Sequence, residues 1–152
     1  RPLCRGGRMN RRRLLLAAAA AALAGGAAFL LPGRGSFAGP TLSAPEAMAR
    51  ATAGTLTLID IRRPDEWADT GIPAPAKPLD MRSPDFEAKL AELAGGREAP
   101  VALICARGVR SMRMAARLQA AGFTNVIDVP EGMLGSSAGP GWQARGLPVV
   151  RP

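Results

Sequence analysis

Short apolar runs separated by helix signals constrain the fold of this chain more than any other feature. Thr55 to Ile61 (TLTLIDI) is β-branched and apolar, which predicts a buried strand, and residues 101–104 and 125–129 predict two more. Because these strands alternate with helical segments, we expect a single α/β domain with a parallel central sheet covered by helices on both faces. Ligands of such sheets bind beyond the carboxyl ends of the strands, where Asp60 and Cys105 stand.

Capping residues and helix-stopping glycines predict the helices. Ser43 and Glu46 form a capping box with Pro45 in the first turn, which predicts a helix up to about Thr52. Similar signals predict three further helical segments, namely a short turn over 64–67, a helix from 83–85 to 95–96, and a helix over 111–121 that ends at Gly122.

Two segments are predicted to be loops. Residues 71–78 contain three prolines, and residues 130–148 are rich in Gly, Ser and Pro. Trp142 lies in the second segment. We expect it to anchor this tail in the core, with the mouth of a pocket as the alternative position.

The positive charge of the chain is concentrated at its N-terminus. The formal net charge is +8, and the first 38 residues hold seven of the 20 basic residues and no acidic residue. The remaining 114 residues carry 13 basic and 12 acidic groups, so this body is nearly neutral. With only two Trp and no Tyr, it also lacks an aromatic surface for stacking bases. We therefore exclude a nucleic-acid partner.

Residues 1–38 are typical of an export leader. Three arginines at 11–13 precede an uncharged stretch over residues 14–31, and Ser36-Phe37-Ala38 has small residues where a signal peptidase cleaves. The paired arginines indicate a twin-arginine (Tat) signal, with Met9 as the start of translation and the mature domain over residues 39–152. We expect a periplasmic or otherwise exported protein. The alternative is an inner-membrane anchor formed by residues 14–31.

The thiol and imidazole content excludes several kinds of site. Cys4 and Cys105 are the only cysteines and there is no His, so a four-ligand structural zinc site is excluded and no metal or cofactor is expected. Mechanisms in which a His acts as the base are excluded as well. A nucleophile in this chain must therefore be activated by its surroundings.

Cys105 directly follows a predicted strand and begins a loop that turns straight into a helix. The N–H groups of such a loop form a nest for an anion, and the helix N-terminus adds free N–H groups and a positive dipole end. We expect the Cys105 thiol at this focus to ionise more readily than a free thiol. A lone Cys after an apolar strand is more often a core residue, but the glycine and two arginines that follow favour a functional one. The expected anion-binding residues are Ala106, Arg107, Gly108, Val109, Arg110 and Ser111.

The segment Cys105-Ala106-Arg107-Gly108-Val109-Arg110 resembles the active-site loop Cys-x-x-Gly-x-Arg of the rhodanese family. Residues 60–67 (DIRRPDEW) resemble the family's Asp-x-Arg-x-x-x-Glu-aromatic signature, and residues 121–126, 131–133 and 146–148 resemble later family motifs in the expected order. The resemblance covers roughly residues 42–150. One departure is Thr70-Gly71-Ile72-Pro73, which lacks the family's His, and another is an insertion over residues 136–140 near the site.

The resemblance implies a thiosulfate sulfurtransferase without a cofactor. The Cys105 thiolate takes the outer sulfur of thiosulfate or a similar anionic donor, and the resulting persulfide passes it to cyanide, a thiol or a protein acceptor. Asp60 is expected to have a structural role at its strand end, by holding loop N–H groups or by pairing with an arginine such as Arg62.

Two other functions remain open. One is a non-catalytic binding or sulfur-carrier module of the same fold. The other is a Cys-based phosphatase or arsenate reductase, which resembles a Cys-x5-Arg loop sized for a tetrahedral oxyanion. The spacing from Cys105 to Arg110 is Cys-x4-Arg, which favours a sulfur atom.

Overall fold

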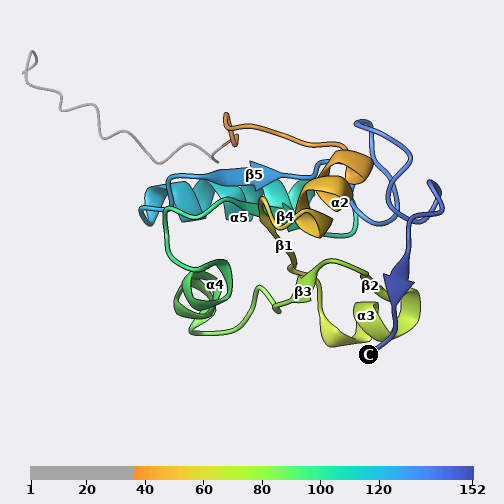
Figure 1. Cartoon of the computed structure of the whole chain (residues 1–152), viewed down its shortest axis with the longest axis horizontal. Coiled ribbons are helices and arrows are strands. Elements are labelled where there is room, and N and C mark those ends of the chain that lie inside the picture. The colour runs from red at the N-terminus through yellow and green to blue at the C-terminus, as the bar shows by residue number, and fades with distance from the viewer. Residues whose placement is uncertain (1–35) are drawn as a thin grey trace, which may run out of the picture. The chain divides into compact units, whose positions relative to one another are not determined.

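The computed structural model describes residues 36–152 of the chain (Figure 1). The predicted leader therefore lies almost wholly outside the described residues, and so do Met9, Cys4 and the alternative membrane anchor. Within residues 36–152, no helix has the length and apolar character needed to cross a membrane.

A four-stranded parallel sheet forms the centre of the fold. Its order is β3-β1-β4-β5. The strands are β1 (Thr57–Asp60), β3 (Lys77–Pro78), β4 (Val101–Ile104) and β5 (Val126–Asp128). A separate antiparallel pair joins β2 (Ile72–Pro73) to β6 (Val149–Val150) near the C-terminus. The parallel α/β arrangement expected from the sequence is confirmed.

The helices of residues 36–152 are α2 (Ala44–Thr52), which precedes β1, and α3 (Pro64–Thr70), α4 (Phe86–Ala94) and α5 (Val109–Ala120), which connect the strands. The capping box predicted for α2 is present, because the backbone N–H of Ser43 donates to the Glu46 carboxylate at 2.9 Å and the Ser43 hydroxyl accepts from the Glu46 N–H. The amphipathic helix α5 buries Met114, Ala115 and Leu118 against the sheet.

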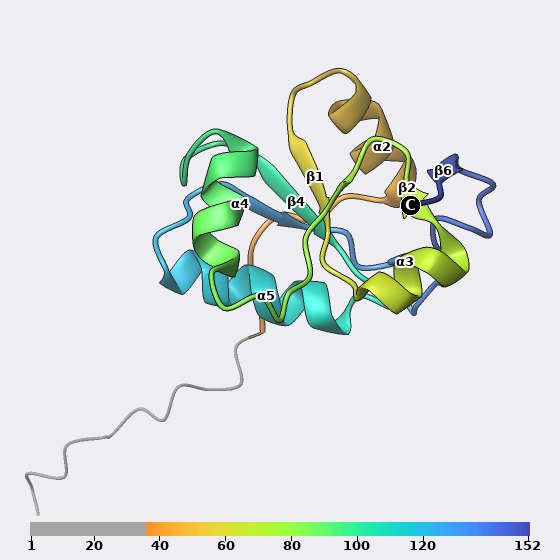
Figure 2. The ribbon, with the colours of Figure 1, turned by 90° about the horizontal axis from the view of Figure 1, so that it is seen from below.

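The side chains of the strands alternate between two cores. Val101, Leu103 and Cys105 pack with α4 and α5 on one face, whereas Ala102 and Ile104 pack with α2 on the other. Figure 2 shows α4 and α5 on one side of the sheet and α2 on the other. The expectation of helices on both faces is confirmed.

The tail after β5 belongs to the second core. Trp142 is fully buried there with Met133, and its indole N–H donates to the Pro148 carbonyl at 3.0 Å. The Glu131 carboxylate accepts from the backbone N–H groups of Ala44 and Gly141 and so joins the tail to the start of α2. The expected anchoring role of Trp142 is confirmed.

The prediction of a loop over residues 71–78 was wrong in part, because β2 and β3 lie within it. Each strand has two residues, and Pro78 lies in β3 at the edge of the sheet, where a missing N–H breaks no internal hydrogen bond. Two helices also begin at other residues than expected, α4 at Phe86 and α5 at Val109.

Candidate active site

Cys105 directly follows β4, and its sulfur contacts the N-terminus of α5. The backbone N–H of Ser111 donates to Sγ at 3.4 Å, and Sγ lies 3.5 Å from the Ser111 hydroxyl oxygen. Ser111 is the third residue of α5, so this N–H belongs to the first turn, whose donors have no partner within the helix. Cys105 itself is buried, with 1% of its surface exposed.

Gly108 makes the tight turn between Cys105 and α5. Its φ of +81° lies in the left-handed region, and a Cβ at this position would lie 2.1 Å from the Pro130 carbonyl oxygen. Any other residue would therefore be strained and would also displace the chain after β5. The positive φ of Gly108 confirms that this position needs the backbone freedom of glycine, as the sequence analysis expects.

The segment after β5 packs along the Cys105 loop. Met133 N–H donates to the Cys105 carbonyl and Leu134 N–H to the Ala106 carbonyl, each at 2.9 Å. The Arg107 guanidinium donates to the Gly135 carbonyl at 3.4 Å. Residues 136–140, which the sequence analysis interprets as an insertion, follow this contact directly in the chain. The hydroxyl of Ser136, the first residue of this segment, donates to the Pro130 carbonyl at 2.8 Å.

The two arginines of the loop differ in their charge environment. Arg110 makes two hydrogen bonds to the Glu66 carboxylate, at 2.8 and 2.5 Å, and this guanidinium lowers the pKa of Glu66 to about 2. Glu66 of α3 therefore compensates the positive charge of Arg110, one of the residues that the sequence predicts to bind the anion. Arg107 has no carboxylate partner within residues 36–152.

Asp60 and Arg62 form a buried ion pair at the end of β1. The Arg62 guanidinium donates to both carboxylate oxygens of Asp60, with the shortest distance 2.6 Å, and the side chains are 0% and 1% exposed. Arg62 also donates to the Thr70 hydroxyl and to the Gly71 carbonyl, each at 2.6 Å. The predicted pairing is confirmed. The Arg62 side chain thereby ties the C-terminal end of α3, the helix that carries Glu66, to the end of β1.

Asp128, at the end of β5, is a buried carboxylate near the site that the sequence analysis did not identify. It is 3% exposed, and its Oδ1 atom has no hydrogen-bond partner within residues 36–152. Burial raises the pKa of Asp128. The one signal in the sequence is a carboxylate inside the apolar run over residues 126–129.

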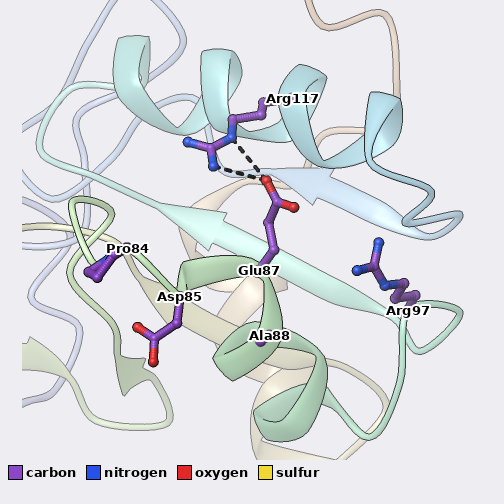
Figure 3. Close-up of a pocket in the computed structure, with 6 residues that line it drawn as sticks. All are labelled: Pro84, Asp85, Glu87, Ala88, Arg97 and Arg117. Atoms are coloured by element: carbon purple, nitrogen blue, oxygen red, sulfur yellow. Dashed lines mark hydrogen bonds and ion pairs between the residues drawn. The ribbon is translucent and has the colours of Figure 1, made fainter.

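A charged surface cleft between α4 and α5 is a separate feature (Figure 3). Arg117 and Glu87 form an ion pair of 2.9 Å across it, and none of its lining residues belongs to the Cys105 loop. Elsewhere in residues 36–152, no group of three or more His, Cys, Asp or Glu side chains is placed to hold a metal ion. The Cys105 loop is therefore the place where the described residues combine a nucleophile with anion-binding groups.

The family model of the rhodanese-like domain matches residues 43–138, which is more than half of the chain. This chain belongs to the rhodanese-like family. Among curated protein sequences, none matches the chain at a significant level. The rhodanese-like fold and the position of Cys105 at the end of β4 agree with the resemblance found in the sequence.

Solved structures similar to this rhodanese-like protein include two sulfurtransferases. The polysulfide-sulfur transferase of Wolinella succinogenes is 27% identical with a TM-score of 0.58, over 74% of this chain and 79% of that chain. The thiosulfate sulfurtransferase of Pseudomonas aeruginosa is 26% identical with a TM-score of 0.56, over 74% of this chain and 20% of that chain.

A third similar structure is a protein of unknown function from Rhodopseudomonas palustris, described as a possible tyrosine phosphatase. It is 19% identical with a TM-score of 0.56, over 98% of this chain and all of that chain. At this identity the likeness concerns the fold alone. Family membership supports a sulfurtransferase-type activity for the rhodanese-like domain.

Proposed function

We propose that this rhodanese-like protein is a sulfurtransferase that moves sulfane sulfur from thiosulfate or a similar donor to a thiophilic acceptor through a persulfide on Cys105. The observation that carries the proposal is the Ser111 N–H, which points from the first turn of α5 at the Cys105 sulfur. A helix N-terminus at this distance stabilises negative charge on sulfur. It favours the anionic sulfur in the thiolate and in the persulfide alike.

The proposed reaction has two displacement steps. The Cys105 thiolate attacks the outer sulfur of thiosulfate, the bond between the two thiosulfate sulfurs breaks, and sulfite leaves with the electron pair. The acceptor then attacks the terminal sulfur of the persulfide, and Cys105 leaves as a thiolate. Cyanide as the acceptor yields thiocyanate, and a thiolate yields a persulfide.

The loop supplies binding and charge stabilisation for both steps. Because the chain contains no His, the anionic sulfur depends on N–H donors and positive charge around it. Arg107, which has no carboxylate partner in residues 36–152, attracts the anionic donor. Arg110, held by Glu66, positions the first turn of α5 and offers its guanidinium to a donor that displaces the carboxylate.

The activities of the two similar sulfurtransferases support the choice of donor class. They transfer sulfur from polysulfide and from thiosulfate, which are both anions that carry sulfane sulfur. The apolar side chains of Val109 and Leu134, exposed by 52% and 40%, lie on and beside the loop. They support a protein thiol as one acceptor.

We further propose that the mature domain is exported. The leader over residues 1–38 supports this, with its arginines before an uncharged stretch and a Ser-x-Ala site. N-terminal sequencing of protein from cell fractions is expected to find a start near Gly39 outside the cytoplasm. Full-length protein in the cytosol would contradict export, and full-length protein in the membrane fraction would favour the anchor.

A steady-state assay separates sulfur transfer from the other functions of this fold. We expect the purified protein to form thiocyanate from thiosulfate and cyanide, and Cys105→Ser to form none, because a hydroxyl does not carry sulfane sulfur. Hydrolysis of an aryl phosphate by the same preparation would favour the phosphatase. Failure with thiosulfate and with polysulfide, together with inactivity on the phosphate, would favour a binding module.

A further inference from the structure

The Ser111 side chain lies between the Cys105 sulfur and the Gly108 carbonyl, at the start of α5. The Cys105 thiol donates to the Ser111 hydroxyl oxygen at 3.5 Å, and this hydroxyl donates to the Gly108 carbonyl at 3.0 Å. The three groups therefore form a chain in which both hydrogens point away from the sulfur. Such a chain requires the protonated thiol, because a thiolate has no hydrogen to donate.

The Gly108 carbonyl can release the Ser111 hydrogen and still keep a hydrogen bond. It also accepts from the backbone N–H of Met112 at 3.0 Å. A carbonyl oxygen has two lone pairs, so this second bond remains when the hydroxyl turns away. Rotation about the bond between Cβ and Oγ of Ser111 moves only the hydrogen, and no shift of α5 is required.

The Cys105 sulfur and the Ser111 hydroxyl are both shielded from bulk water. Ser111 is 0% exposed and Cys105 is 1% exposed. A hydrogen bond to an anion is strong in such surroundings, and a buried anion with few donors is costly. In residues 36–152, the Ser111 backbone N–H at 3.4 Å is the one N–H group that donates to this sulfur. The Ser111 hydroxyl is the second donor within reach of a thiolate.

Charged side chains take no part in this chain of hydrogen bonds. Within residues 36–152, no hydrogen bond or ion pair joins a charged group to the Cys105 sulfur or to the Ser111 hydroxyl. Replacing Ser111 by Ala changes no charge around the loop, so a change in the ionisation of Cys105 would report the lost hydroxyl. The charged side chains on the elements around the loop are those of Arg107, Arg110, Glu66, Asp60, Arg62 and Asp128.

We propose that the Ser111 hydroxyl is a catalytic group that changes its hydrogen-bond partner with the charge on the Cys105 sulfur. It donates to the Gly108 carbonyl when the sulfur is a thiol or part of a persulfide, and to the sulfur when the thiolate forms. The thiol proton passes to a base in the solvent, and Ser111 keeps its own hydrogen throughout. The hydroxyl thereby stabilises Cys105 as the ionised nucleophile and as the leaving group of sulfur transfer. The second of these roles rests on the proposed function.

The pH profile of Cys105 alkylation by iodoacetamide tests the inference without a sulfur donor. The full chain carries Cys4→Ser, so that Cys105 is the remaining thiol. We expect Ser111→Ala to move the midpoint of the profile upward by about one pH unit, the effect of one hydrogen bond to a charged group. The plateau at high pH is expected to rise about threefold, because a less stabilised thiolate is the stronger nucleophile. Below the midpoint, alkylation is expected to slow about threefold as the two effects combine.

Two further variants separate the hydroxyl from a structural effect of the substitution. Ser111→Thr keeps a hydroxyl that can reach the carbonyl three residues earlier in the helix, so its midpoint is expected to stay near that of the parent. Thr55→Val removes a hydroxyl that donates to the Arg50 carbonyl at 3.1 Å, outside the site, and should leave the profile unchanged. A merely structural role of Ser111 would slow alkylation at every pH and would not raise the plateau.

Discharge of the persulfide tests the role of the hydroxyl toward the leaving group. Protein loaded with thiosulfate and freed from excess donor is mixed with cyanide, and thiocyanate is followed in a single turnover. We expect Ser111→Ala to slow this step about threefold to tenfold, because a less stabilised thiolate leaves more slowly. The same substitution is therefore expected to raise the alkylation plateau and to lower the discharge rate.

Several outcomes would overturn the inference. An unchanged midpoint in Ser111→Ala would show that the hydroxyl does not stabilise the thiolate, and a lower plateau would show that it acts by structure alone. Discharge at the parent's rate would remove the leaving-group role. If Ser111→Thr does not fold, the opposite effects of Ser111→Ala on plateau and discharge still decide. A parent protein that alkylates normally but gains no sulfur from thiosulfate would reject the proposed function and leave the alkylation result standing.

Discussion

The carboxylates that end β1 and β5 lie on either side of β4 and differ in how they are satisfied. Asp60 and Asp128 are both buried, at 0% and 3% exposure. Asp60 is saturated by the Arg62 guanidinium, whereas Oδ1 of Asp128 has no partner in residues 36–152. A saturated buried charge holds one geometry, while a carboxyl with an open position is able to change its hydrogen bonds. The β1 end is therefore held by a buried ion pair, whereas the β5 end keeps one buried oxygen without a partner in residues 36–152.

Removing Arg62 is expected to have the largest effect, because it would convert the β1 end into an unpaired buried charge. We expect Arg62→Ala to reduce the free energy of unfolding by about 3–5 kcal/mol, the cost of an uncompensated buried carboxylate. Denaturant unfolding measures it. The matched control is Arg82→Ala, because Arg82 pairs with Asp80 at the same sequence spacing and the same 2.6 Å but is 61% exposed. The control should cost far less, because an exposed ion pair is solvated in both states. Equal losses in the two variants would contradict the distinction between the buried Asp60–Arg62 pair and the exposed Asp80–Arg82 pair.

Gly108→Ala is expected to have the second-largest effect, because Gly108 lies where the Cys105 loop meets the segment after β5. The new Cβ would be in a left-handed conformation and 2.1 Å from the Pro130 carbonyl oxygen. We expect a loss of about 2–3 kcal/mol in unfolding free energy and a large loss of Cys105 reactivity, since the loop and the start of α5 must shift. Gly54→Ala serves as the control, because Gly54 also has a positive φ, of +70°, with nothing within 4 Å of a Cβ. Normal Cys105 reactivity in Gly108→Ala would show that the loop geometry does not matter.

Glu66→Gln tests the ion pair between Glu66 of α3 and Arg110 of α5. The pKa of Glu66 is about 2 in the folded protein, below its ordinary value of 4.5. The pair therefore stabilises the fold above the ordinary value, and this contribution is lost as the pH falls toward about 2. We expect Glu66→Gln to cost about 1 kcal/mol at neutral pH and progressively less in acid. Thermal unfolding across this pH range measures the loss. Glu98→Gln, at an exposed position, controls for the substitution, and a pH-independent loss would contradict the pairing.

Arg117→Ala is expected to have the smallest effect. Arg117 pairs with Glu87 in the surface cleft of Figure 3, and its side chain is 57% exposed. We expect less than about 1 kcal/mol in unfolding free energy and an unchanged rate of thiocyanate formation. A marked loss of rate with anionic donors would mean that charge outside the Cys105 loop guides the substrate.

Local patterns were sufficient to predict most of the fold. The capping box at Ser43 and the apolar run ending at Ile104 are short-range signals, and the structure confirms both. The two strands within residues 71–78 were missed because Pro73 and Pro78 argue against a strand unless its place at an edge is known. That place depends on the order of strands, which no local pattern contains.

Within the candidate site, contacts between distant residues could not be predicted. Arg110 is followed by no acidic neighbour, and its partner Glu66 comes from 44 residues away. In the sequence, Asp128 is only a single acidic residue within a short apolar run. Its burial depends on the pairing of β5 with β4, which no local pattern contains.

The mass of the intact protein after treatment with thiosulfate tests the central claim most directly. With Cys4 replaced by Ser, Cys105 is the remaining thiol, so a gain of one sulfur atom reports a persulfide at this position. We predict this gain in the parent, its reversal by cyanide or dithiothreitol, and no gain in a folded Cys105→Ser variant. A parent protein that gains no sulfur from thiosulfate or polysulfide, while its thiol still reacts with iodoacetamide, would contradict the sulfurtransferase account.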